Sequence, residues 1–227
     1  MESIKNYGNE KLYRLPRGDF GKRKRIVNKT QIVGIYDLVG FSSLDSNREL
    51  VSTVKIMETQ IELVLSPRFT WGATTIEGEE PENDIWLSST GDGYIVAFSQ
   101  GMNDFVALQI LTEIHSAIRK RNKVKLGINK GENYLINDLN DRVNLVGWGI
   151  NLAARALDFA QTNQIICTEY FSKPLFNTYG DKINGEIMID VGIQTIKTSK
   201  LRLYNYYSNG KFGASLTSEQ KNNHTAK

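Results

Sequence analysis

Cysteine and proline are scarce in this sequence of 227 residues, which contains one cysteine and four prolines. A disulfide scaffold or a cysteine-ligated metal site needs several thiols at set spacing, so both are excluded. The cysteine, Cys167, lies in the apolar run QIICT, which predicts a buried strand thiol rather than a nucleophile. No apolar run approaches the length of a membrane span, and the first residues lack the hydrophobic segment of a signal peptide. We therefore expect a soluble, cytoplasmic protein.

Net charge is also small, at +3, but it is unevenly distributed. Residues 1–29 carry nine Lys/Arg against three Asp/Glu, a charge of +6, which leaves −3 for the rest of the chain. This basic arm contains GKRKR but no aromatic platform or recognition motif, so we expect a solvated or partner-binding leader rather than nucleic-acid binding. Residues 209–227 are polar and are expected to form a flexible tail. A single globular domain is predicted between them, over residues 30–208.

Apolar spacing within that domain switches between strand and helix patterns. In chain order the predicted elements are a strand within 31–41 that ends near Asp37, a helix from Asn47 to about Leu65, a surface connection at 66–84, a hairpin at 85–98, a helix at 104–121 containing a structural His115, a strand at 123–132, a helix at 147–161, a strand and the start of a short helix at 163–171, and closing strands at 186–208. The first half of this order, β-α-β-β-α-β, is ferredoxin-like. The expected fold class is α+β, with an antiparallel-rich sheet and helices packed on it.

Two aspartates are notable because this topology brings their strands side by side. Asp37 ends the first strand, and Asp92 lies at the hairpin turn, between two glycines in STGDGY. An Asp-Gly pair by itself suits any tight hairpin. Two neighbouring carboxylates, however, repel each other unless one is protonated or a divalent cation lies between them. Because oxygen ligands suit Mg²⁺ or Mn²⁺, we expect a site for two metal ions and phosphoryl chemistry.

Two other segments also favour phosphate chemistry. Gly40, in DLVGFSSL, permits close backbone approach after the first strand, so N–H groups there can hold a polyphosphate. In the helix at 147–161, Asn151 and Arg155 are four residues apart and share a face. Arginine supplies fixed positive charge to a transferring phosphoryl group, and an asparagine amide can orient a ribose oxygen. Taken alone, this helix would be interpreted as having two solvent-facing polar residues.

The segments YDLVGFSSL, STGDGYIVAF, KLGINKGE and VGWGINLAARALDFA together resemble the class III nucleotidyl cyclase catalytic domain, the family of adenylate and guanylate cyclases. The resemblance covers the chain from about Gln31 to Tyr207. It implies that two metal ions bind at Asp37, Leu38 and Asp92.

The same resemblance assigns roles to residues around the substrate. Gly40 and Phe41 are implied to bind the nucleotide. Asn151 and Arg155 are implied to stabilise the transition state as the ribose 3′-hydroxyl attacks the α-phosphate and pyrophosphate leaves.

The resemblance also implies a head-to-tail homodimer with two active sites at the interface. Each site takes its metal-binding aspartates from one chain and its Asn/Arg pair from the other. Lys197 or Lys200 lies where the family often keeps a lysine for the triphosphate, and we favour Lys197, although either can be an ordinary surface lysine.

The positions that recognise the base depart from the family's patterns. Four residues before the hairpin aspartate, adenylate cyclases have Lys and guanylate cyclases have Glu, whereas this chain has Ser88. Asn144 stands where adenine-specific members commonly have Asp. In this respect the chain resembles the stand-alone pyrimidine cyclases of bacterial anti-phage Pycsar systems, whose product activates a separate effector. We therefore expect conversion of UTP to cyclic UMP, with Trp148 packing at the dimer interface or narrowing the pocket.

Other functions stay open at this stage. The nearest alternative is cyclic CMP synthesis, followed by an adenylate or guanylate cyclase with an atypical base pocket, and then by an inactive nucleotide-binding dimerisation module. A diguanylate cyclase ranks lower, because its hairpin turn has two glycines before consecutive Asp and Glu, unlike STGDGY. A nucleic-acid polymerase ranks lowest, because the chain leaves no room for template-binding domains.

Overall fold

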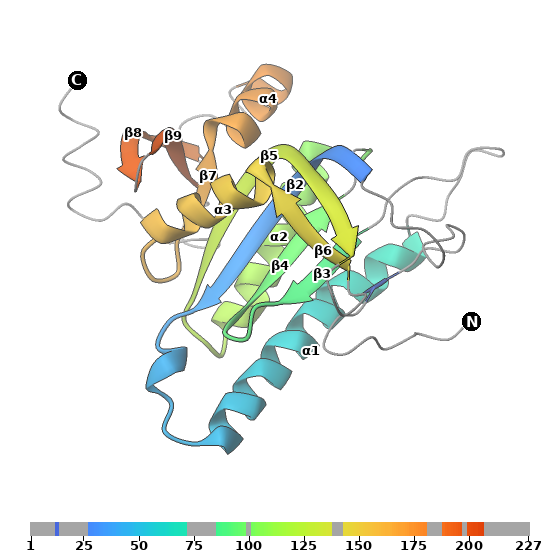
Figure 1. The fold of residues 1–227 in the computed structure, drawn as a ribbon, viewed down its shortest axis with the longest axis vertical. Helices are drawn as coiled ribbons and strands as arrows, with labels where there is room; N and C mark the ends of the chain where they lie inside the picture. Colours follow the sequence, from blue (N-terminus) through green and yellow to red (C-terminus); the bar gives the residue numbers. More distant parts are fainter. Residues whose placement is uncertain are drawn as a thin grey trace.

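The fold is described from a computed structural model, over residues 12–13, 27–71, 85–98, 101–137, 143–180, 188–196 and 199–206. These residues form a nine-stranded sheet with helices on both faces (Figure 1). Most of the basic arm and all of the predicted tail at 209–227 lie outside the described residues. Within the described part of the chain, no helix combines the length and the apolarity that a membrane span requires.

The sheet is antiparallel except for one parallel pair, β5 with β7. Its strands are β1 (Leu12–Tyr13), β2 (Val27–Leu38), β3 (Ile85–Ser89), β4 (Gly93–Phe98), β5 (Val124–Asn137), β6 (Val143–Gly147), β7 (Ile165–Thr168), β8 (Met188–Ile196) and β9 (Ser199–Tyr206). The spatial order is β1-β3-β4-β2-β5-β7-β9-β8, and β6 pairs with the far end of β5. The long strands β2 and β5 therefore form the centre of the sheet.

The helices are α1 (Asn47–Trp71), α2 (Asp104–Arg119), α3 (Trp148–Phe159) and α4 (Glu169–Tyr179), with a short 3₁₀ helix, η1 (Phe41–Ser43), after β2. The predicted α+β fold class is confirmed, because β2-α1-β3-β4-α2-β5 is the expected ferredoxin-like order and α3-β7-α4-β8-β9 follows it. Helix α1 continues past the expected end at Leu65 and through Pro67. A proline removes one backbone donor, which a helix of 25 residues tolerates.

The β5–β6 hairpin was missed, because no strand was predicted between residue 132 and the glycine-rich start of the following helix at 147. In the structure, Leu145 is buried and Val146 is exposed, which is the alternation expected of a strand. Strand β5 correspondingly runs to Asn137, five residues beyond the predicted end at 132.

Alternation along the strands divides the hydrophobic core between the two faces of the sheet. One face of β2, β4 and β5 packs against α1, α2 and α4 in a cluster that includes Tyr36, Leu38, Val96, Leu126, Met57, Leu111 and Phe171. The Tyr36 hydroxyl donates a hydrogen bond to the Leu111 carbonyl across 2.8 Å. The other face carries Val33 and Ile35, which pack with Ala153 of α3, and Figure 1 shows α3 alone on that face. Residues that alternate with Tyr36 and Leu38 therefore face the α3 side.

Two titratable residues lie in this core, as predicted. His115 of α2 is fully buried, and burial lowers its pKa to about 4, so its imidazole is neutral at pH 7. Cys167 of β7 is also fully buried, and burial raises the pKa of its thiol well above the usual value. Neither residue has the exposure that a nucleophile or a general base requires.

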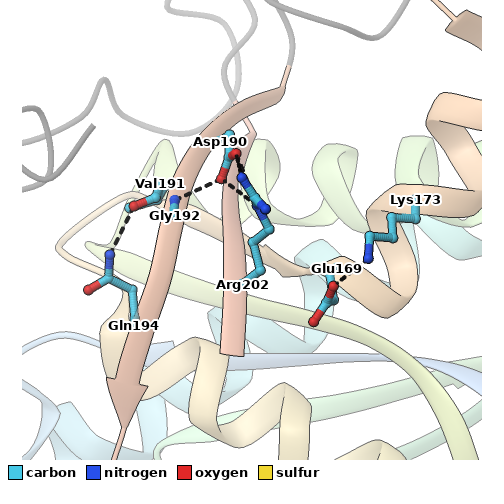
Figure 2. A network of polar contacts seen from close by, with 7 residues as sticks. All are labelled: Glu169, Lys173, Asp190, Val191, Gly192, Gln194 and Arg202. Atoms are coloured by element: carbon cyan, nitrogen blue, oxygen red, sulfur yellow. Dashed lines mark hydrogen bonds and ion pairs between the residues drawn. The ribbon is translucent and has the colours of Figure 1, made fainter. Parts of the chain in front are cut away.

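Two ion pairs lie at the β8–β9 edge of the sheet, where α4 lies near these strands (Figure 2). The Arg202 guanidinium donates to the Asp190 carboxylate, with 2.6 Å between Nη2 and Oδ2. The same carboxylate accepts a hydrogen bond from the Gly192 N–H at 2.7 Å, at an irregularity in the β8–β9 register. On α4, Lys173 and Glu169 form an i,i+4 ion pair at 2.7 Å. Both carboxylates in this network have a cationic partner.

Candidate active site

Asp37 and Asp92 lie side by side where β2 meets the β3–β4 turn. Asp37 pairs with Gly93 in the β2–β4 register, and the Leu38 N–H donates to the Asp92 carbonyl across 3.0 Å. Because Tyr36 and Leu38 face the α1–α2 core, the Asp37 side chain faces the α3 side. Burial and then the Asp92 charge raise the pKa of Asp37 above its usual value. Burial is the larger cause of this rise, and the neighbouring carboxylate adds to it.

Backbone contact fixes the distance between these two aspartates. A Cβ at position 93 would lie 1.9 Å from the Tyr36 carbonyl oxygen, so only glycine permits the turn to approach β2 this closely. The Thr90 N–H closes the turn by donating to the Gly93 carbonyl at 3.0 Å. Gly93 is therefore needed for more than the hairpin turn, because its close approach to β2 places Asp92 beside Asp37.

Two further charged residues lie near Asp37, and the sequence analysis missed both. Lys125 is the β5 residue directly opposite Asp37, and its charge lowers the pKa of the Asp37 carboxyl. Asp158, near the end of α3, acts in the opposite direction and raises that pKa. Lys125 was detectable only from the β2–β5 register, which links residues far apart in the sequence. Asp158 lies seven residues after Asn151 and so continues the same helical face.

This donor set fits a hard divalent cation. Two adjacent carboxylates offer oxygen ligands, and a cation between them would relieve their repulsion. Leu38 has its side chain in the core, so only its backbone carbonyl is available as a further ligand. Among the described residues, no group of three or more His, Cys, Asp or Glu side chains could hold one ion together. Any remaining ligands would be backbone oxygens, waters or substrate phosphates, which is usual for Mg²⁺.

The loop after β2 carries the other residues predicted to contact nucleotide on this side. Gly40 is exposed and has a φ of 84°, in the left-handed region that favours glycine. Its carbonyl accepts hydrogen bonds from the backbone N–H and the hydroxyl of Ser43, at 3.1 and 2.7 Å. Phe41 is half-buried and packs against the core cluster, which anchors the loop next to Asp37.

Helix α3 is held tightly onto β5 where it begins. The Asn133 side chain accepts a hydrogen bond from the Ile150 N–H at 2.8 Å, and the Asn129 side chain donates to the Gly149 carbonyl at 3.0 Å. A Cβ on Gly149 would lie 2.3 Å from Asn133 Nδ2, so the helix can approach this closely only with glycine there. Thr168 donates in turn to Asn129. The buried amides thus fix the position of every side chain on α3.

The outer face of α3 presents four residues at spacings of three, four and three. They are Trp148, Asn151, Arg155 and Asp158, and we call them the α3 stripe. Leu152, Ala153 and Ala156 are buried on the opposite side of the helix. The stripe contains both residues proposed to stabilise the transition state, so the structure places Asn151 and Arg155 on one face.

The predicted base-recognising residues lie on separate strands. Ser88, on β3, is 9% exposed and lies opposite Ile95, a residue of the cluster on the α3 side. Asn144, on β6, is half-buried and pairs with Ile136 of β5. Strand β6 pairs only with β5 among the described strands, but its Leu145 belongs to the same buried cluster as Trp86 of β3. Lys197 lies outside the described residues, and Lys200 is exposed on β9.

The length of β5 separates Asp37 from Asn144. Lys125, opposite Asp37, and Ile136, opposite Asn144, are eleven residues apart on this strand. At about 3.3 Å per residue, that is roughly 36 Å of strand. Asp37 and Asn144 therefore lie beside opposite ends of β5 within one chain.

Comparison with protein-family models finds no match, and comparison with curated protein sequences finds none either. Solved structures, in contrast, match over most of the chain. The catalytic core of a rhodopsin-guanylyl cyclase with converted specificity, in complex with ATPαS, has a TM-score of 0.64 and 16% identity, over 82% of this chain and 100% of that one. The chain has the fold of nucleotidyl cyclase catalytic domains.

Two other cyclases agree with this result. The non-canonical dimeric guanylyl cyclase domain of the RhoGC fusion protein from the aquatic fungus Blastocladiella emersonii has a TM-score of 0.61 and 15% identity, over 80% of this chain and 98% of that one. The adenylyl cyclase CyaB from P. aeruginosa has a TM-score of 0.59 and 15% identity, over 83% of this chain and 100% of that one. The resemblance to adenylate and guanylate cyclases is therefore confirmed at the level of the fold.

Proposed function

We propose that this protein is a metal-dependent nucleotidyl cyclase, which converts a nucleoside triphosphate to its 3′,5′-cyclic monophosphate and pyrophosphate. The observation that carries the proposal is the adjacent pair Asp37 and Asp92, held together by Gly93 on a cyclase fold. Burial and, to a smaller extent, the charge of Asp92 raise the pKa of Asp37. Two neighbouring carboxylates that repel each other lower the stability of the fold unless they bind a cation. Their close placement therefore favours a metal-binding role.

The proposed active form is a head-to-tail homodimer with two sites. The placement of Asp37 and Asn144 beside opposite ends of β5, with roughly 36 Å of strand between them, supports this arrangement. In a head-to-tail dimer, the aspartate end of one chain meets the α3 stripe of its partner, and the second site is formed by symmetry. The fungal guanylyl cyclase domain with this fold is described as a non-canonical dimer in one structure and as monomeric in another, so it supports the ability of this fold to dimerise and no particular arrangement.

On the aspartate side, Asp37, Asp92 and the Leu38 carbonyl would hold one or two Mg²⁺ or Mn²⁺ ions. Bound there, the ions would activate the ribose 3′-hydroxyl and neutralise charge on the leaving pyrophosphate. Lys125 adds a positive charge across the sheet from Asp37 and can bind a phosphate oxygen. The loop at Gly40 and Phe41 offers backbone groups to the triphosphate. We also keep Lys197 as a candidate for binding the triphosphate.

On the helix side, the partner chain would contribute Asn151 and Arg155. The Arg155 guanidinium carries a permanent charge that stabilises the growing negative charge on the transferring phosphoryl group. The Asn151 amide, one turn away, is exposed and can hold the ribose ring so that its 3′-oxygen faces the α-phosphate. These two residues thus position and stabilise, and neither needs to gain or lose a proton.

For the base we propose uracil, so that UTP gives cyclic UMP as a second messenger for a separate effector in anti-phage defence. Ser88 and Asn144 replace the charged groups that adenylate and guanylate cyclases use at these positions. A hydroxyl and an amide each offer a donor and an acceptor, and these suit the carbonyl and N–H groups on the edge of a pyrimidine. Cytosine offers a similar edge, so CTP is the second candidate substrate.

The test is to incubate the purified full chain with Mn²⁺ and, separately, UTP, CTP, GTP and ATP, and to identify each product by mass. Cyclic UMP as the main product would support the whole proposal, and the Asp92→Ala variant should yield none. Cyclic AMP or cyclic GMP alone would keep the cyclase and reject the pyrimidine pocket. No cyclic product from any nucleotide would favour a nucleotide-binding dimerisation module.

A further inference from the structure

Trp148 is the most exposed of the large apolar side chains in the described part of the chain, at 66%. Leaving an indole in water forgoes the free energy of burying it, so such a residue often contacts a ligand, a partner or a charged group. Its backbone is held firmly, because it immediately precedes Gly149, the residue clamped between Asn129 and Asn133. Trp148 is therefore a fixed aromatic surface at the start of the α3 stripe.

The ring of Trp148 faces the residue that carries positive charge in the stripe. The Arg155 guanidinium carbon lies 5.9 Å from the centre of the indole, within the range of a cation–π interaction. Trp148 and Arg155 are seven residues apart, or two helical turns, so both project from the same face of α3. Asn151 lies between them on that face.

Arg155 also has an unused donor. Its Nη1 atom is shielded from solvent and has no hydrogen-bond partner among the described residues. Guanidinium N–H groups are strong donors that normally find a partner when they are buried. An arginine held by a ring leaves its donors free, because a π-face attracts the charge without accepting all of its N–H groups, whereas a carboxylate would occupy them.

We propose that Trp148 is a positioning residue, whose indole holds the Arg155 guanidinium on the outer face of α3, where the guanidinium meets the transferring phosphoryl group. The inference rests on the proposed cyclase function and goes beyond it by giving Trp148 a role. The phosphoryl group would belong to a nucleotide bound by the aspartates of the partner chain. The ring does not touch the substrate and acts through Arg155.

The first test measures the pairing without turnover. Tryptophan emission is compared between the wild type and Arg155→Met, and again between Trp148→Phe and the Trp148→Phe/Arg155→Met double variant. Removing the guanidinium should change the emission in the first comparison and leave the second unchanged. Equal changes in both comparisons, or none in the first, would overturn the pairing.

The second test separates positioning from base contact by kinetics with the best nucleotide. Trp148→Leu should lower kcat by about 3- to 10-fold and leave KM within about twofold, whereas Trp148→Phe, which keeps a π-face, should stay within about threefold of the wild type. In an Arg155→Ala background, Trp148→Leu should have no further effect, because nothing remains to be held. Tyr170→Leu, which removes an aromatic residue 52% exposed on α4, is the matched control and should leave both constants unchanged.

The other outcomes are informative. A rise in KM with kcat unchanged would mean that the ring contacts the nucleotide base, and a full additional loss in the Arg155→Ala background would mean that it acts elsewhere, for example at the dimer interface. Either result overturns the positioning role. If the wild type makes no cyclic nucleotide at all, the proposed function fails and the positioning role fails with it, whereas the emission experiment still reports whether the two side chains pair.

Discussion

The carboxylates at two edges of this molecule lie in opposite electrostatic surroundings. At the β8–β9 edge, Asp190 accepts from Arg202 and from a backbone N–H (Figure 2). At the β2–β4 junction, Asp37 lies beside a second carboxylate, and its pKa is raised by burial and by that neighbour. Ion pairs of the first kind need no function to explain them. The carboxylate pair points to a ligand, because a bound divalent cation would make that arrangement favourable.

The strongest way to test this contrast is to remove each carboxylate and measure turnover. Asp37→Ala and Asp92→Ala should each lower cyclic nucleotide formation by at least about 100-fold, because each removes a proposed metal ligand. Asp190→Ala should leave turnover within about twofold, because its partner Arg202 lies away from the site. Rates are compared at saturating Mn²⁺. Wild-type turnover by Asp37→Ala or Asp92→Ala would reject the assignment of these aspartates as metal ligands.

A second way is to move the turn that carries Asp92 away from β2 without removing a charge. In Gly93→Ala the new methyl group would collide with the Tyr36 carbonyl and push the turn away from β2. We expect a loss of about 10- to 100-fold in kcat, since small displacements of reacting groups have effects of that size. The matched control is Gly192→Ala at the ion-paired edge, where φ is 83° and nothing lies within 4 Å of the new methyl group. This control should lose about 1 kcal/mol of stability and keep its kcat, and equal loss of kcat in both variants would indicate a general effect of lost glycine.

A third experiment tests whether Asp37 and Asp92 form an active site with the α3 stripe of the same chain or with that of the partner chain. Asp92→Ala and Arg155→Ala, each strongly impaired alone, should regain activity when they are mixed and allowed to exchange. Random pairing makes half of the dimers mixed, and each mixed dimer has one intact site, so about a quarter of wild-type activity is expected. Mass spectrometry of the intact dimers verifies the exchange, and mixed dimers without activity would count against the two-chain site.

The smallest expected effect is on thermal stability. Replacing the aspartate by asparagine should change the Tm in opposite directions at Asp37 and at Asp190. Because the folded-state pKa of Asp37 is raised, its contribution to stability is favourable below the unfolded pKa and is lost as the pH rises through the folded pKa. Without metal at pH 7, Asp37→Asn should therefore raise the Tm slightly, and this gain should vanish as the pH falls towards 4. Asp190→Asn should instead lower the Tm. The loss in the free energy of unfolding should be less than about 1 kcal/mol, because the ion pair that this variant breaks is partly exposed.

Melting curves in the presence of a chelator measure both changes. Added Mn²⁺ should then raise the Tm of the wild type and have no such effect on Asp37→Asn, since only a site that binds the ion is stabilised by it. A destabilised Asp37→Asn variant in the absence of metal would show that the carboxylate has a favourable partner at the junction.

Local pattern was sufficient to predict the features that depend on neighbours in sequence. The strand ending at Asp37, the turn at Asp92 and the shared face of Asn151 and Arg155 all follow from short periodicities, and the β-α-β-β-α-β order brings the first two together. Features set by long-range register were not predictable in this way. Lys125 became a neighbour of Asp37 only through the β2–β5 pairing. Strand β6 was missed because its five residues end in a glycine and carry too short an alternation to distinguish from a helix start.

Strand β5 also bears on how output would depend on the amount of protein. Because Asp37 and Asn144 lie beside opposite ends of this strand, a lone chain has no complete site in the proposed arrangement. Below the dissociation constant of the dimer, the concentration of complete sites rises with the square of the chain concentration. Doubling the protein would then give about four times the product, whereas well above that constant it would give only about twice. A cell that held the chain near this threshold would keep its basal signal low and could raise it steeply by making more of the protein.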